Sequence, residues 1–205
     1  MQAYLRIIFM QKPGLKAFCN ALNEAHIRWA LFAGTATALL TSNRVPTDID
    51  IIVHDNDFEM LAQLLKEATR TDNATFPITT SDGEALSMIA STLWLEVDGT
   101  EIDIMSRAKF VSDEGEFVTS LSDVAVAHRI ELRERETSVW LAEPFDTILF
   151  KAFMRRGAEQ NKFDVSDIEA IVKRIPMDRD YIEKRVNETG LSSRAQSLLK
   201  KLNIV

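Results

Sequence analysis

Three aspartates lie in strand-like parts of this sequence, and their spacing is the first feature that points to chemistry. Asp48 and Asp50 are two residues apart in the run DIDIIV. Because successive side chains of a strand face opposite ways, both carboxylates would lie on one face, about 7 Å apart along the strand. Carboxylate oxygens placed in this way suit a hard divalent cation. Taken alone, the pair also fits two solvated acids at the start of a strand.

The third aspartate, Asp103, belongs to a predicted hairpin. The runs STLWLEV and TEIDIM flank Asp98-Gly99, and this dipeptide between strand-like runs is a strong signal for a two-residue turn. Such a turn pairs Trp94 with Asp103 and places Asp103 on the face opposite Ile102 and Ile104. An acid inside an Ile-Asp-Ile strand suggests that a cation uses it. The alternative is a one-sided sheet whose polar face meets water.

Three carboxylates on two strands match what two-metal phosphoryl chemistry requires, because two divalent ions about 3.5–4 Å apart must be held by oxygen ligands. Gly34 and Thr35 supply a complementary feature at the end of an apolar run and the start of a predicted helix. Glycine lets a backbone approach closely, and free N–H groups at a helix N-terminus attract phosphate. The alternative for this pair is an ordinary strand-to-helix turn.

The runs AGT, RVPTDIDI and EIDI together resemble the nucleotidyltransferase fold of the polymerase-beta superfamily. The likeness is to small bacterial nucleotidyltransferases, including those of abortive-infection toxin systems. It implies that Asp48, Asp50 and Asp103 are both catalytic and metal-binding, with Mg²⁺ or Mn²⁺ as the cofactor and an NTP as the substrate. Thr35 stands where the family usually has glycine or serine, and it keeps a hydroxyl there. The nucleotide-binding positions implied by the likeness are Gly34, Thr35, Arg44, Thr47 and Lys151.

The resemblance continues into the runs LAEPFDTILFKAFMRRG and NKFDVSDIEAI. Lys151 lies one step off an apolar helical stripe, so its ammonium would either reach the NTP triphosphate or extend to solvent as a surface lysine. Asp164 and Asp167 are expected to have a structural role, capping a helix and steadying Lys151 or Arg155. Lys162 matches the same motif, but its role is left open.

The elements that must position these residues follow from hydrophobic periodicity and turn signals. Helices are expected at 15–25, at 35–40 and after Asn56, and strands at 28–33 and 48–53, while 71–84 reads mostly as loop. A weaker hairpin is expected around Gly115, with two extended pieces within 127–141. After Pro144 the pattern is helical only. The fold class is therefore α+β: a nucleotidyltransferase-like mixed sheet flanked by helices in residues 1–143, with a C-terminal helical appendage in residues 144–205.

Composition narrows the class of protein further. The 205 residues are 46% hydrophobic and 27% charged, which excludes a disordered, collagen-like or coiled-coil chain. A net charge of −7 argues against a protein that coats nucleic acid through bulk charge. The single cysteine, Cys19, can form neither an internal disulfide nor a zinc site alone. The first apolar run is too short for a signal sequence or a membrane span, so a cytoplasmic protein without a membrane partner is expected.

The sequence thus predicts a nucleotidyltransferase that moves an NMP from an NTP to an acceptor hydroxyl by two-metal phosphoryl transfer. One alternative is a catalytically silent protein of the same fold that acts as a binding or toxin–antitoxin partner. A weaker one is a glycosyltransferase that uses the Asp-x-Asp motif, although the chain is short for that class and the glycine would be unexplained. The acceptor stays open between RNA, a protein and a small molecule such as an aminoglycoside.

Overall fold

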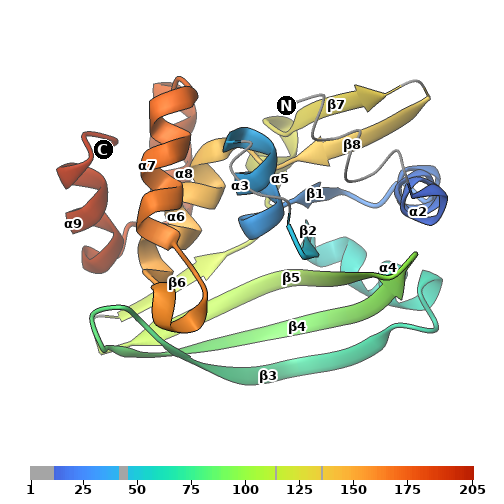
Figure 1. Cartoon of the computed structure of the whole chain (residues 1–205), viewed down its shortest axis with the longest axis horizontal. Coiled ribbons are helices and arrows are strands. Elements are labelled where there is room, and N and C mark those ends of the chain that lie inside the picture. The colour runs from blue at the N-terminus through green and yellow to red at the C-terminus, as the bar shows by residue number, and fades with distance from the viewer. Residues whose placement is uncertain (1–11, 42–45, 114, 135) are drawn as a thin grey trace.

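The computed structural model describes residues 12–41, 46–113, 115–134 and 136–205 (Figure 1). The strands are β1 (Trp29–Leu31), β2 (Asp48–Val53), β3 (Thr69–Thr79), β4 (Ala85–Val97), β5 (Thr100–Ser112), β6 (Gly115–Thr119), β7 (Ile130–Glu134) and β8 (Thr137–Leu141). The helices are α2 (Pro13–Glu24), α3 (Ala33–Thr41), α4 (Phe58–Leu64), α5 (Asp123–Ala127), α6 (Pro144–Met154), α7 (Asp164–Arg174), α8 (Arg179–Thr189) and α9 (Ser193–Lys201), with short 3₁₀ turns η2 (Asp55–Asp57) and η3 (Ala158–Gln160).

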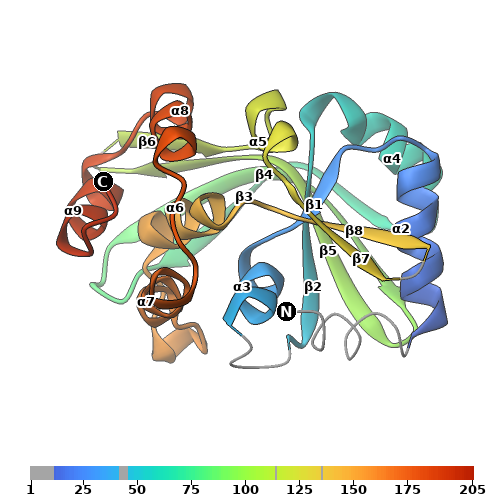
Figure 2. The same cartoon turned by 90° about the horizontal axis from the view of Figure 1, so that it is seen from above.

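The strands form one mixed sheet in the order β3-β4-β5-β2-β1-β8-β7, with β6 also paired to β5. Two neighbouring pairs are parallel, β2 with β5 and β1 with β8, and the others are antiparallel. Helices α6 to α9 gather at one end of the molecule, and α2 and α4 lie at the other (Figures 1 and 2). A mixed sheet flanked by helices confirms the predicted α+β class.

The hairpin predicted at Asp98-Gly99 is confirmed in register. Val97 pairs with Thr100 and Trp94 with Asp103 in the antiparallel ladder of β4 and β5. Both turn residues have positive φ, 50° and 68°, as the favoured two-residue hairpin turn requires. The turn at Asp98-Gly99 therefore fixes which residue of β4 pairs with Asp103.

Strand β5 contains a bulge that changes which of its side chains face the helices. Ala90 of β4 pairs with Ala108 and Thr92 pairs with Met105, so β5 has one extra residue between the two pairs. A bulge of this kind breaks the strict alternation of faces. Asp103 and Met105 therefore share a face with Ala108 and Phe110, and Phe110 contacts Phe150 of α6.

The prediction that residues 71–84 are mostly loop is wrong. Residues 69–79 form β3, which pairs with β4 along most of its length and lies at the edge of the sheet. Most of its side chains are exposed or only partly buried, and it contains Pro77, which an edge strand tolerates. Residues 69–73 are polar and exposed, and Pro77 interrupts the alternation of Ala74, Phe76 and Ile78, so the sequence pattern resembled a loop.

The C-terminal helices pack closely onto the sheet. Helix α6 begins at Pro144 as predicted, and every one of its residues is buried. The Phe150 ring lies 5.0 Å from that of Phe32 and 5.6 Å from that of Phe110, which joins α6 to the sheet core. The division of the chain at residue 143 into a core and a helical region stays a prediction. In the described part of the chain, none of the helices has the length and apolar character needed to span a bilayer.

Candidate active site

The three predicted aspartates converge at the junction of β2 and β5. The parallel register of these strands sets Asp50 beside Asp103 and Asp48 beside Glu101. One carboxylate oxygen from each of Asp48, Asp50 and Asp103 lies within 4.8 Å of the other two. The structure thus brings together all three residues for which the sequence predicted a common metal site.

Helix α3 fixes the carboxylate of Asp50. Its Oδ2 accepts hydrogen bonds from the backbone N–H groups of Gly34 at 2.8 Å and Thr35 at 3.3 Å. These are N–H groups of the first turn of α3, which have no partner within the helix and favour a negative charge. The groups predicted to hold phosphate therefore hold a metal-ligand candidate here, and their contact with phosphate stays a prediction.

Thr35 and Ala33 complete the junction between α3 and β2. The Thr35 side chain is fully buried, and its hydroxyl accepts the backbone N–H of Asp50 at 2.8 Å and donates to the carbonyl of Asp48 at 3.3 Å. Ala33 adopts φ of 44°, a left-handed conformation that costs a non-glycine residue about 1–2 kcal/mol. The hydroxyl kept at Thr35 thus binds the backbone that carries both aspartates.

Burial and the charges of neighbouring carboxylates raise the pKa values of Asp50 and Asp103. Burial raises the pKa of Asp50, and repulsion from Asp48 raises it further; the N–H groups of α3 and the Lys162 ammonium oppose this shift without cancelling it. Partial burial also raises the pKa of Asp103 to about 6, with added repulsion from Asp50 and Asp48. A bound cation would relieve this repulsion.

The donor set fits a hard divalent cation. Three carboxylates offer oxygen atoms only, which suits Mg²⁺ or Mn²⁺ better than a metal that prefers sulfur or nitrogen. Among the residues that the structure describes, no lysine, arginine or histidine forms an ion pair with any of the three. Asp48, Asp50 and Asp103 are therefore the residues that would hold the metal.

Lys151 is buried, with 2% of its surface exposed, which overturns the alternative of a surface lysine. Its ammonium lies 3.1 Å from Oδ1 of Asp164 and 2.9 Å from Oδ2 of Asp167. Burial alone would raise the pKa of Asp164, but Lys151 and Arg156 outweigh that effect, and the pKa is lowered. The predicted steadying of Lys151 by the two aspartates agrees with this geometry, and its contact with a triphosphate stays a prediction.

A pocket of about 290 Å³ opens between the aspartates and the start of α7, and we call it the α7 pocket. Gly34, Asp48 and Asp50 line one side of it. The segment between α6 and α7 lines the other, with Arg156, Asn161, Lys162 and Phe163. The Phe163 side chain is 45% exposed.

Sequence reasoning did not assign a role to this segment. Phe163 directly precedes α7 and lies outside the apolar stripe formed by Ile168 and Ile171. An aromatic residue at that position is a sequence signal for an exposed ring. Arg156 carries no comparable signal, because its position depends on how the chain folds back after α6. Thr47 is exposed, with its hydroxyl 3.3 Å from Oδ1 of Asp48, and Arg44 lies outside the described residues.

Comparisons with known proteins give a fold but no close relative. No family model matches the chain, and no curated protein matches its sequence. The chain is similar to the crystal structure of an antigenic nucleotidyltransferase-like protein from Paracoccidioides brasiliensis, with a TM-score of 0.51, 17% identity, and coverage of 91% of this chain and 84% of that one. It also matches ANT(2″)-Ia in complex with adenylyl-2″-tobramycin, with a TM-score of 0.44, 10% identity, and coverage of 89% and 93%.

Identities this low show a shared fold and nothing finer. The match to the Paracoccidioides brasiliensis structure agrees with the fold expected from the AGT, RVPTDIDI and EIDI runs. The likeness to toxin-type members stays a prediction. We conclude that this chain is a protein of the nucleotidyltransferase fold.

Proposed function

We propose that this protein is a divalent-metal-dependent nucleotidyltransferase that transfers an NMP from an NTP to an acceptor hydroxyl. The observation that carries the proposal is the convergence of Asp48, Asp50 and Asp103 beside the N-terminus of α3. The nucleotidyltransferase fold supports it, and so do the two cations, Arg156 and Lys162, on the opposite wall of the α7 pocket.

Mg²⁺ or Mn²⁺ held by the three aspartates would offset the charge of the NTP phosphates and of the departing pyrophosphate. The chain's own residues then orient the nucleotide. We place the triphosphate in the α7 pocket, where Lys162 and Arg156 supply positive charge. The further proposed contacts of the triphosphate are Gly34, Thr35, Thr47, Lys151 and Arg44.

The transfer replaces a phosphoanhydride bond of the NTP with a phosphoester bond to the acceptor. The acceptor oxygen bonds to the α-phosphorus, while the bond from that phosphorus to the oxygen bridging to the β-phosphorus breaks. Pyrophosphate leaves with the electron pair of that bond. Asp103 lies on the side of the site away from α3, and its carboxylate is positioned to take the proton of the acceptor hydroxyl.

Phe163 provides a surface for the nucleobase. Its ring is exposed at the rim of the pocket that would hold the triphosphate. Stacking of a base on an aromatic ring contributes about 1–3 kcal/mol, and it accepts every base because each has a π-face. The pocket therefore holds an NTP through phosphate charge and stacking.

Transfer of label from NTP tests the function directly. The protein is incubated with Mg²⁺, each α-labelled NTP in turn, and separate pools of tRNA, protein and small metabolites. The proposal predicts label transfer to one pool with stoichiometric release of pyrophosphate, and loss of both in Asp48→Asn but not in Asp55→Asn, which lies beyond the end of the same strand. Equal transfer by wild type and Asp48→Asn would reject the proposed role of the triad.

A catalytically silent protein of the same fold is the second candidate. The observation in its favour is that the N–H groups of Gly34 and Thr35 donate to Asp50 instead of facing an open phosphate site. Calorimetry that shows NTP binding without pyrophosphate release from any acceptor pool would select this candidate. A toxin–antitoxin partner belongs to the same alternative.

A further inference from the structure

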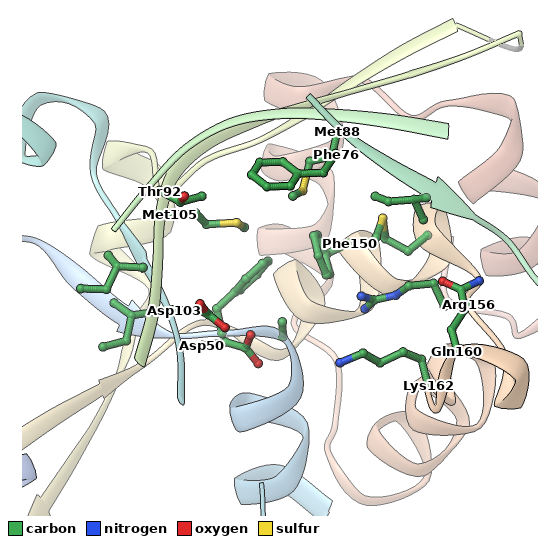
Figure 3. Close-up of a pocket in the computed structure, with 16 residues that line it drawn as sticks. Asp50, Phe76, Met88, Thr92, Asp103, Met105, Phe150, Arg156, Gln160 and Lys162 are labelled. Carbon is green, nitrogen blue, oxygen red and sulfur yellow. The ribbon is translucent and has the colours of Figure 1, made fainter. Parts of the chain in front are cut away.

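A second pocket, of about 360 Å³, shares Asp50, Arg156 and Lys162 with the α7 pocket and extends in the other direction, over β5, β4 and β3. We call it the sheet pocket (Figure 3). Asp103 lines the sheet pocket and does not line the α7 pocket. A ligand in the sheet pocket would therefore approach the triad from the side opposite the proposed triphosphate.

The wall of the sheet pocket is formed by one face of three strands. Phe76 pairs with Met88, and Met88 pairs with Phe110, so these side chains point to the same face. The bulge in β5 brings Met105 and Asp103 onto this face as well. Without that extra residue, Asp103 would lie on the opposite face from the apolar wall.

The lining is mostly apolar and adaptable. Phe76, Met88 and Met105 from the sheet face Phe150 from α6 (Figure 3), and Met154 of α6 also lines the pocket. Methionine side chains are flexible and polarizable, and they contact aromatic rings favourably. Ring-shaped apolar groups therefore suit this wall, and the volume lies within the range of small-molecule sites.

The charged groups of the sheet pocket gather near its opening to the α7 pocket. Asp50 and Asp103 lie at one side of this opening, and Arg156 and Lys162 reach toward it from the other (Figure 3). Of the described residues that line the sheet pocket, no carboxylate is present apart from these two metal-ligand candidates. A polycationic acceptor would therefore find no further acid to pair with its amines.

Contacts with the C-terminal helices hold this pocket in shape. Arg194 of α9 is 4% exposed and pairs with Asp82 at 3.0 Å and with Glu84, both at the turn between β3 and β4. The N–H of Ser81 donates to the carbonyl of Arg155 at 2.8 Å. The β3–β4 hairpin is thus tied to the helices that form the opposite wall, so the pocket is largely preformed.

We propose that the sheet pocket binds the acceptor, and that the acceptor is an uncharged small molecule with an apolar ring system and a hydroxyl group. This inference rests on the proposed function, because it assigns a substrate class to the same site. The ring lies against Met88 and Met105, and the hydroxyl points to Asp103. In the transfer, the hydroxyl oxygen gains the bond to the α-phosphorus, its proton passes to Asp103, and pyrophosphate departs with the electron pair.

The binding test uses 2-naphthol, a neutral ring compound with one hydroxyl, and the wild-type protein labelled with ¹³C at its methionine methyl groups. Met88 and Met105 line the sheet pocket, whereas Met60 on α4 is 44% exposed and does not. The proposal predicts saturable shifts of the Met88 and Met105 signals while Met60 stays unchanged. Unchanged Met88 and Met105 signals at saturating probe would overturn it, and this measurement requires no variant.

Variants and competing acceptors extend the test. Met88→Trp fills the pocket, and the same change at the exposed Met60 is the matched control. We expect Met88→Trp to weaken 2-naphthol binding by about tenfold or more, equivalent to about 1.4 kcal/mol, and Met60→Trp to bind as wild type. With α-labelled NTP and Mg²⁺, label should pass to 2-naphthol in preference to tobramycin or tRNA. Preference for tobramycin or for tRNA would overturn the proposal.

Failure of this inference and failure of the proposed function give different results. NTP binding in the presence of Mg²⁺ is measured separately by calorimetry on the same samples. If NTP binds and pyrophosphate is released with another acceptor, but 2-naphthol neither binds nor accepts label, only the acceptor assignment is wrong. If no NTP binds, the proposed function fails, whatever the sheet pocket holds.

Discussion

The carboxylate of Asp50 and the backbone of Gly34 are in direct contact, because Oδ2 of Asp50 accepts the Gly34 N–H at 2.8 Å. A Cβ atom added at Gly34 would lie 2.9 Å from that same oxygen, closer than such atoms normally approach. Gly34 therefore allows Asp50 to reach the start of α3, and the position of a metal-ligand candidate depends on the absence of a side chain.

We expect Gly34→Ala to separate folding from metal binding. Alanine is favoured over glycine in a helix by about 1 kcal/mol, so the free energy of unfolding should change by no more than about that amount. The affinity for Mn²⁺ should fall about tenfold, or about 1.4 kcal/mol, because Asp50 must move. Ala38→Gly in the same helix should lower the free energy of unfolding by about 1 kcal/mol and leave the Mn²⁺ affinity unchanged. Mn²⁺ titration and urea unfolding measure the two effects, and unchanged Mn²⁺ affinity in Gly34→Ala would contradict the contact argument.

Replacing Lys151 with methionine should lower the free energy of unfolding of the protein. The substitution leaves Asp164, which is fully buried, and Asp167 without the ammonium that lies between them. Breaking a buried ion pair on one side costs about 3–5 kcal/mol. Lys109→Met, which removes an exposed pair with Glu116, should cost about 1 kcal/mol or less. Urea unfolding compares the two variants, and wild-type stability in Lys151→Met would show that Lys151 does not hold α6 and α7 together.

Glu143 should make the protein less stable as the pH rises. Its side chain is 9% exposed, and burial raises its pKa from 4.5 to about 8, although a hydrogen bond from the Phe145 N–H opposes the shift. Between those values the folded state holds a proton that the unfolded state has lost, so the free energy of unfolding falls by up to about 1.4 kcal/mol per pH unit. Glu143→Gln keeps an oxygen acceptor and removes the charge.

Urea unfolding of wild type and Glu143→Gln at several pH values from about 5 to about 9 checks this sign. The wild type should lose stability across the range, while the variant should show a flatter dependence and exceed the wild type at the alkaline end. The same slope in both proteins would mean that Glu143 does not titrate in this window.

Phe163 should contribute to NTP binding through its ring alone. Phe163→Leu removes the ring and should weaken Mg²⁺-NTP binding about tenfold, within the range of about 1–3 kcal/mol for one stacked base. Phe163→Trp keeps a ring and should bind about as tightly as the wild type. Binding of tripolyphosphate, which has no base, should be equal in all three proteins by calorimetry. A loss of tripolyphosphate affinity in Phe163→Leu would show that the ring shapes the phosphate site instead.

The local parts of the site could be predicted from the sequence. The Asp98-Gly99 turn fixed the pairing of Trp94 with Asp103, and Asp48–Val53 forms a strand with the expected bounds. Both depend on residues close together in the chain. The edge strand β3 was missed because its first half is polar and Pro77 interrupts the apolar alternation of its second half.

Long-range features could not be derived from the residues alone. The parallel pairing of Asp50 with Asp103 joins segments separated by two strands and a helix, and no local pattern in the sequence predicted it. The bulge in β5 between Met105 and Ala108, which places Asp103 on the pocket face, has no recognisable sequence signal. Burial of Lys151 depends on α7 packing beside α6, so periodicity within α6 could not distinguish a paired lysine from an exposed one.

If Asp48, Asp50 and Asp103 form one divalent-metal site for an NTP, Mn²⁺ binding measured by electron paramagnetic resonance should depend on them. Wild type, the Asp48→Asn/Asp50→Asn double variant and the Asp55→Asn control are titrated with Mn²⁺ with and without NTP. NTP should strengthen Mn²⁺ binding in the wild type and the control, and the double variant should lose at least about tenfold in affinity, about 1.4 kcal/mol. Wild-type Mn²⁺ affinity in the double variant would contradict the proposed metal site.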